Sequence, residues 1–227
     1  MGPIQHPSLK KRHFHNYSLA MTGVITYNGT DPSELIQVLK LLRARPVTGN
    51  RPAELEKCDR IILTGAVNAA HSMDELRGND LDAWLKATKK PILAICLGMQ
   101  LLYETLGEPD AMTESGAVEG LGLMPGTLKK FNPDDAKIPH MGWKRLQFHG
   151  NHPLTNGINQ KQFLYYIHDY YAIRNEYTLA TSCYIKDFAA IVAKDNVMGT
   201  QFHPEKSGAA GSHILQNFLE MSKNALA

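Results

Sequence analysis

The sequence has few cysteines, no long apolar run and no strong imbalance of charge. Three cysteines among 227 residues are too few for a disulfide framework, which favours a reducing compartment. No stretch approaches the roughly 20 apolar residues that a membrane-spanning helix requires. No apolar segment follows the charges near the N-terminus, so we expect no secretory signal. The sequence therefore predicts a cytoplasmic protein that neither crosses nor binds a membrane.

The sequence gives no sign of two further classes of protein, nucleic-acid-binding proteins and metalloproteins. A formal net charge of +2 gives no sign of a surface that binds nucleic acid. His13 and His15 lie in a polar tail without acidic or cysteine neighbours, whereas a zinc site needs three or four convergent ligands. We therefore expect no metal and no organic cofactor.

The order of strand-like and helix-like segments indicates an α/β fold. Continuous apolar runs predict buried strands, whereas apolar residues at the 3.6-residue period predict helices. Strands are expected at 22–27, 58–63 and 91–95, and helices at 33–42, 80–88 and 212–226. We predict a single domain over 21–227, with a mixed, mostly parallel central sheet flanked by helices, after a flexible extension at 1–20.

The second half of the chain is richer in loops and short strands. Loops are expected over 108–135, where glycine, proline and acidic residues are frequent. The β-like runs that follow are predicted to form an antiparallel or mixed part of the same sheet. These runs are 146–148, 162–173, 178–185, 189–195 and 197–202.

Cys96 stands between a predicted strand and a predicted helix. The apolar run 91–95 precedes it, and Met99, Leu102 and Leu106 follow on one face of the expected helix. The small residues Ala94 and Gly98, two positions away on each side, are typical of a nucleophile elbow. At such a turn the helix N-terminus favours the thiolate, and the next backbone N–H faces a developing oxyanion. A lone cysteine, however, is more often a small core residue.

A second motif supplies what a nucleophilic cysteine needs. His203 follows a predicted strand, and Glu205 stands two residues further on. A thiol requires a base to be fully nucleophilic at neutral pH, and the base requires a third group to fix its tautomer. Cys96, His203 and Glu205 therefore form a candidate catalytic triad.

Four ordered motifs together resemble those of class I, triad-type glutamine amidotransferases. They are ICLGMQLL at 95–102, IPHMGWK at 138–144, FLYYIHDYY at 163–171 and QFHPEKSG at 201–208. Within this class the chain is most similar to the glutaminase subunits of imidazole glycerol phosphate synthase. The resemblance extends from about Asp59 to the C-terminus and implies a flavodoxin-like fold.

The resemblance implies a reaction and a partner. Cys96 would attack the side-chain amide of glutamine, and His203 would protonate the departing ammonia. The ammonia would pass, within a heterodimer, to a cyclase subunit with a HisF-like barrel that makes imidazole glycerol phosphate in histidine biosynthesis.

The resemblance also assigns binding residues. Those implied for glutamine are Gly65, Ala66, Gln100, His168, Asp169, Tyr170 and either Glu108 or Glu114, between which the spacing does not decide. Those implied for the partner interface are Pro139, His140, Met141, Gly142, Trp143 and Lys206. A half-buried core position is the alternative for Trp143.

The chain departs from the pattern of the family at several positions, among them Thr64, Ala66 and the turn at 27–34. Val67 replaces a glycine of the loop implied to stabilise the oxyanion, and valine disfavours a positive φ. Ala94 replaces a glycine, Asp169 a serine and Lys144 an asparagine. These departures leave two alternatives open: a divergent paralogue that supplies ammonia to another synthase, for example in sugar amination, and a catalytically weakened regulatory subunit. A third alternative is a stand-alone cysteine hydrolase with a similar elbow.

Overall fold

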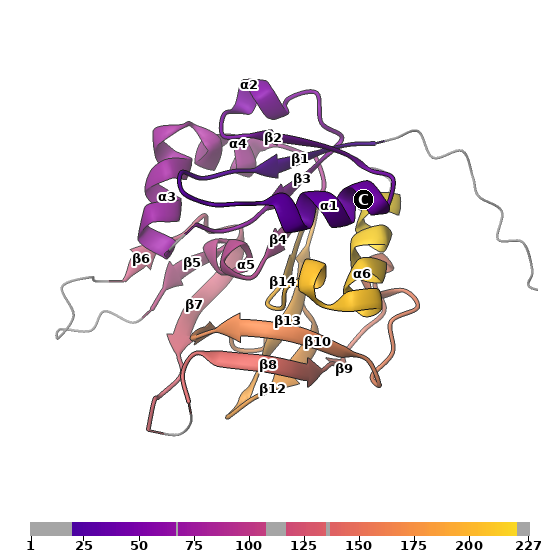
Figure 1. Ribbon diagram of the computed structural model, residues 1–227. Helices are drawn as coiled ribbons and strands as arrows, with labels where there is room; N and C mark the ends of the chain where they lie inside the picture. Colours follow the sequence, from indigo (N-terminus) through magenta and orange to yellow (C-terminus); the bar gives the residue numbers. More distant parts are fainter. Residues whose placement is uncertain (1–19, 67, 108–116, 135–136, 222–227) are drawn as a thin grey trace, which may run out of the picture.

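A computed structural model describes residues 20–66, 68–107, 117–134 and 137–221 (Figure 1). Almost all of the predicted extension at 1–20 lies outside the described residues, as do Val67, Glu108 and Glu114. None of the described helices is both long and apolar enough to cross a membrane. The cytoplasmic location stays a prediction.

The predicted central sheet is confirmed. In the part of the chain that the structure describes, this sheet has eight strands in the order β2-β1-β3-β4-β14-β13-β12-β9. The first five are parallel to their neighbours, and the rest pair antiparallel. In sheet order their bounds are Arg45–Gly49, Met21–Ile25, Arg60–Leu63, Ile92–Ile95, Val197–Thr200, Asp187–Lys194, Thr178–Cys183 and Gln147–Phe148.

Two smaller sheets lie beside the central one. One pairs β8 with β10, and the other has the order β11-β7-β5-β6. Their bounds are His140–Arg145 for β8, Phe163–His168 for β10, Tyr170–Tyr171 for β11, Met124–Lys130 for β7, Tyr103–Leu106 for β5 and Val118–Glu119 for β6. The prediction that 162–173 extends the central sheet was therefore wrong, because this run divides between the two smaller sheets.

Helices cover both faces of the central sheet, as predicted. The helices are α1 Ser33–Leu41, α2 Pro52–Leu55, α3 Ala69–Gly78, α4 Leu81–Ala87, α5 Leu97–Leu101 and α6 Gly208–Glu220. Buried side chains of α1 and α6 join one apolar core, and those of α2 to α5 join another. Side chains alternate along each strand, so Ile62 and Leu93 enter the first core while Ile61 and Ile92 enter the second. This double burial explains why residues 61–63 of β3 and the whole of β4 are apolar.

Two local predictions were wrong. The helix after Cys96 ends at Leu101, and Tyr103–Leu106 forms strand β5, which pairs with β7. The loops expected over 108–135 contain strands β6 and β7. Strand β2, at the edge of the central sheet, was not predicted and contains Pro46. Proline is tolerated there because an edge strand leaves one side of its backbone unpaired.

Candidate active site

Sheet topology brings the proposed triad together. Cys96 follows β4 directly, and His203 lies three residues beyond the end of β14. The two strands are parallel neighbours, with Ile95 opposite Thr200. The carboxyl ends of parallel strands share one edge of the sheet, which is where such folds bind ligands. The loop Thr64–Ala66 follows β3, the next strand along, and so reaches the same edge.

The backbone at Cys96 has the geometry of an elbow. Its φ is 53° and its ψ is −110°, a conformation that residues with a side chain rarely adopt. Its N–H donates to the carbonyl of Thr200 at 2.7 Å, which holds the turn against β14. A Cβ at Gly98 would clash with the carbonyl group of Leu63, and a Cβ at Gly65 would clash with the side chain of Leu97. The close packing of α5 on β3 thus explains why position 98 requires a small residue.

His203 and Glu205 form a tight pair. The Nδ1 atom of His203 lies 2.7 Å from Oε1 of Glu205, and the two side chains are 20% and 10% exposed. Burial by itself lowers the pKa of His203, but hydrogen bonds with Cys96 and Glu205 outweigh it and raise the pKa to about 10. The site therefore favours a protonated imidazole between the sulfur of Cys96 and the carboxylate of Glu205.

Strand β10 holds His203 and Cys96 through its main chain. The carbonyl of Tyr165 accepts the N–H of His203 at 2.9 Å, and the carbonyl of Ile167 accepts the Cys96 thiol at 3.5 Å. Ser207 accepts the N–H of Tyr165 at 2.9 Å and donates to the carbonyl of His203 at 2.6 Å. Sequence reasoning missed Ser207, although it stands in the same motif as His203.

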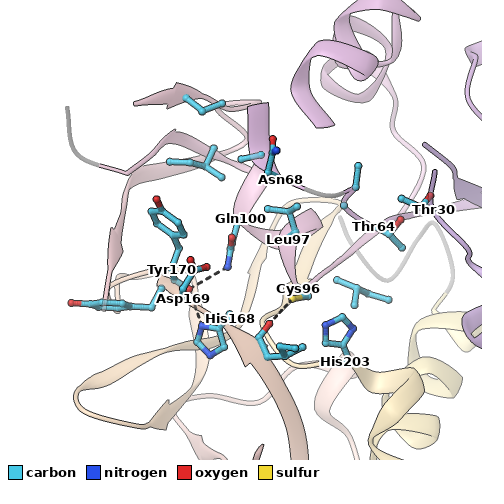
Figure 2. A pocket seen from close by; sticks show the side chains of 18 of the residues that line it. Thr30, Thr64, Asn68, Cys96, Leu97, Gln100, His168, Asp169, Tyr170 and His203 are labelled. Carbon is cyan, nitrogen blue, oxygen red and sulfur yellow. Dashed lines mark hydrogen bonds between the residues drawn. The ribbon is translucent and has the colours of Figure 1, made fainter. Parts of the chain in front are cut away.

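The candidate site opens into a cavity of about 1310 Å³ (Figure 2). The six described residues predicted to bind glutamine all line it: Gly65, Ala66, Gln100, His168, Asp169 and Tyr170. Cys96, His203 and Glu205 line it too. Figure 2 shows the side chain of Gln100 directed at Tyr170 and the ring of His203 beside Cys96.

Two contacts in the cavity wall were not predicted. The N–H of Ala66 donates to the hydroxyl of Ser72 at 2.9 Å, and that hydroxyl donates to the carbonyl of Asn68 at 2.8 Å. Gln201 is fully buried and donates from Nε2 to the sulfur of Cys96 at 3.9 Å. An amide side chain at the end of an apolar strand, two residues before His203, was the available signal.

The predicted interface motif lies on the two-stranded sheet. Met141 and Trp143 are 59% and 51% exposed, and Trp143 packs edge-on against Tyr165 of β10. Phe163 is 47% exposed and lies under the guanidinium group of Arg145. We call these five residues the outer face of the β8–β10 sheet.

The other predicted interface residues lie elsewhere. The side chain of His140 is 1% exposed and stacks on Tyr184, so it points into the interior rather than toward a partner. Pro139 immediately precedes β8, and Gly142 within it has a φ of 141°. Lys206 pairs with Glu34 of α1 at 2.9 Å, at the rim of the cavity.

Among the described residues, no three histidine, cysteine or acidic side chains gather closely enough to hold a metal ion. The expectation of a site without a metal stays a prediction.

Comparison with known proteins agrees with this geometry. The family model for class-I glutamine amidotransferases matches residues 35–221, so the chain belongs to this family. Two solved structures from Thermotoga maritima share the fold at 20% and 14% identity. One is PurLQS (TM-score 0.64; 89% of this chain and 98% of that one), and the other is a glutamine amidotransferase (TM-score 0.57; 83% and 77%).

More similar sequences narrow the family. HisH subunits of imidazole glycerol phosphate synthase from Bacteroides fragilis, Bacillus velezensis and Bacillus cereus are 36%, 39% and 40% identical. The alignments cover 88%, 89% and 87% of this chain and 98%, 97% and 93% of those proteins. Among the glutamine amidotransferases, the chain is a member of the HisH group.

Proposed function

We propose that this protein hydrolyses glutamine and supplies the ammonia to a cyclase subunit that makes imidazole glycerol phosphate in histidine biosynthesis. The observation that carries the proposal is the meeting of Cys96, on a strained elbow, with the His203–Glu205 pair at one edge of a cavity. The similarity to HisH subunits supports the choice of substrate, partner and pathway.

The triad performs both half-reactions. The thiolate of Cys96 attacks the side-chain carbonyl carbon of glutamine, and the imidazolium of His203 protonates the amide nitrogen as the C–N bond breaks. Ammonia leaves and a glutamyl thioester remains. A water molecule then gives a proton to His203 and attacks the thioester, and the bond to sulfur breaks to release glutamate. Glu205 holds the imidazole in the required orientation throughout.

The oxyanion needs backbone donors. The N–H of Leu97, the first residue of α5, directly follows the nucleophile, as an oxyanion donor does in elbow sites. A second donor would come from the loop after β3, but the N–H of Ala66 is bound to Ser72. The loop must therefore rearrange before this N–H can serve the oxyanion, which favours activity that depends on a partner.

The contacts of Gln100 define how it would meet the substrate. Its Nε2 donates to the carbonyl of Tyr170 at 3.2 Å and to Oε1 of Gln201 at 3.2 Å. Both amide hydrogens are thus used, so toward a ligand Gln100 acts as an acceptor. An acceptor there suits the ammonium group of the amino acid.

The outer face of the β8–β10 sheet is the proposed docking surface for the cyclase. It combines tryptophan, tyrosine, phenylalanine, methionine and arginine, which are enriched at protein interfaces. One edge of β10 pairs with β8, and the other edge contacts Cys96 and His203. A partner bound on the outer face would therefore be separated from the triad by the single strand β10.

The test is the release of ammonia from glutamine by the protein alone and with the cyclase, with Cys96→Ala as the control. We expect turnover that rises when the cyclase is added and is abolished by Cys96→Ala. Equal release by the wild type and Cys96→Ala, with the cyclase present, would contradict the proposal and favour a regulatory subunit. Rapid cleavage of γ-glutamyl peptides without a partner would favour a stand-alone hydrolase. Stimulation by a sugar-aminating synthase, but not by the cyclase, would favour a paralogue.

A further inference from the structure

The sulfur of Cys96 has a buried polar neighbour that the triad does not include. Gln201 is 0% exposed, and its N–H donates to the carbonyl of Ala190 at 2.9 Å, which fixes its backbone. Its side-chain Nε2 donates to Sγ of Cys96, and its Oε1 accepts from Nε2 of Gln100. One amide side chain thus contacts both the nucleophile and a residue that lines the substrate cavity.

The hydrogen bonds continue beyond Gln100 to the two-stranded sheet. The carbonyl of Tyr170, which accepts from Gln100, also accepts from Nδ1 of His168 at 2.8 Å. The Nε2 of His168 lies 3.0 Å from Nδ1 of His140, its cross-strand neighbour on β8. Five hydrogen bonds therefore connect β8 with the sulfur of Cys96.

The donor and the acceptor of each of these five hydrogen bonds are determined. The carbonyl of Tyr170 can only accept, so His168 carries its proton on Nδ1 and its Nε2 must accept from His140. On the other side, Gln100 must turn its NH₂ group toward Tyr170 and Gln201, which leaves Oε1 of Gln201 as acceptor and its NH₂ group as donor. The chain thus ends with a donor aimed at sulfur.

Burial keeps both histidines in this arrangement. It lowers the pKa of His168 to about 3 and that of His140 to about 4. Both rings are therefore neutral at physiological pH. A proton on Nε2 of His168 would place two donors face to face and break the bond to His140.

We propose that Gln201 is a positioning residue that holds the sulfur of Cys96 and the amide of Gln100 in one fixed geometry. This inference rests on the proposed glutaminase function. A donor to sulfur stabilises the thiolate over the thiol. The same side chain keeps the NH₂ group of Gln100 turned away from the substrate, so the carbonyl oxygen of Gln100 remains the group offered to glutamine. Gln201 therefore acts on both nucleophile and substrate without touching the reacting carbon.

The experiment replaces Gln201 by methionine, which has a similar size but no hydrogen-bonding group. Alkylation of Cys96 by iodoacetamide is followed over a range of pH by mass spectrometry of the peptide that carries it. The KM and kcat for glutamine are measured with the cyclase present. The matched control is Ser182→Ala. This substitution removes a buried hydrogen bond to the carbonyl of Arg145 in β8 that is not one of the five.

For Gln201→Met we expect the half-maximal pH of alkylation to rise, with a rate in mildly acidic buffer about threefold to tenfold lower. The KM for glutamine is expected to increase, and Ser182→Ala should change neither quantity. An alkylation profile and a KM equal to those of the wild type would overturn the proposal. If Gln201→Met does not fold, Gln100→Met frees the amide of Gln201 to rotate and should shift the profile in the same direction; no shift would again overturn it.

Alkylation does not depend on turnover, so the two hypotheses fail separately. Wild-type protein that releases no ammonia, combined with a shifted profile in Gln201→Met, would overturn the proposed function and support the role of Gln201. Ammonia release by the wild type, combined with an alkylation profile and a KM of Gln201→Met that equal those of the wild type, would support the proposed function and overturn the role of Gln201.

Discussion

Replacing Gly98 by alanine should displace helix α5 and thereby disturb the turn at Cys96. The added Cβ would fall on the carbonyl group of Leu63, 2.8 Å from its carbon, and 3.0 Å from the oxygen of Thr64. Both neighbours are backbone atoms, and ordinary contacts begin at about 3.4 Å, so α5 must move away from β3. Overpacking of this kind costs about 1–3 kcal/mol of stability. Because α5 carries Gln100 and begins directly after Cys96, misplacement on the order of 1 Å should lower turnover by roughly 100-fold.

The protein offers a matched control for this substitution. A Cβ at Gly78, the last residue of α3, would meet nothing within 4 Å. Gly78→Ala should leave turnover unchanged and raise stability by about 0.4–1 kcal/mol, because alanine restricts the unfolded chain. Urea unfolding and a coupled assay of ammonia release, with the cyclase present, measure both effects. A Gly98→Ala protein with wild-type stability and turnover would refute the packing argument.

Three further substitutions test other parts of the structure. Ser72→Ala frees the N–H of Ala66, so ammonia release without the cyclase should rise relative to release with it. An unchanged ratio would contradict the idea that the hydrogen bond to Ser72 keeps this N–H from the oxyanion. Burial lowers the pKa of His140 and of His168 below the ordinary 6.5, so the unfolded chain binds protons that the folded protein excludes. Stability should therefore be complete above pH 6.5 and fall as the pH drops toward 4, by up to roughly 1.4 kcal/mol per pH unit for each histidine. His140→Phe should flatten this dependence in urea titrations, and an equal slope would argue against it. Trp143→Ala should change stability by less than about 0.5 kcal/mol but weaken cyclase binding by about 2 kcal/mol or more in calorimetry, since the side chain is 51% exposed; unchanged affinity would exclude it from the interface.

Much of the fold and the triad could be predicted because the relevant signals are local. The runs around Ile62 and Ile95 are apolar throughout, which is typical of strands buried on both faces. Cys96 and His203 each follow a buried strand. Once the two strands are known to be parallel neighbours, their carboxyl ends must meet.

The misses arose where one pattern fits two structures. Leu102 and Leu106 are spaced for one helical face, yet Leu106 is buried from strand β5. His140 and Trp143 stand in one motif, but they point to opposite sides of β8, and strand register cannot be read from spacing alone. Gln201 was missed because its role depends on Gln100, which is distant in sequence.

The side chains and the main chain of strand β10 make different contacts, so the two can change independently during evolution. The proposed contact with the cyclase uses the side chains of Phe163 and Tyr165, whereas Cys96 and His203 are held by carbonyl groups of Ile167 and Tyr165. Every amino acid carries such a carbonyl group. The surface can therefore change its sequence to follow a changing partner while the same strand continues to hold the catalytic groups, as long as its backbone stays extended.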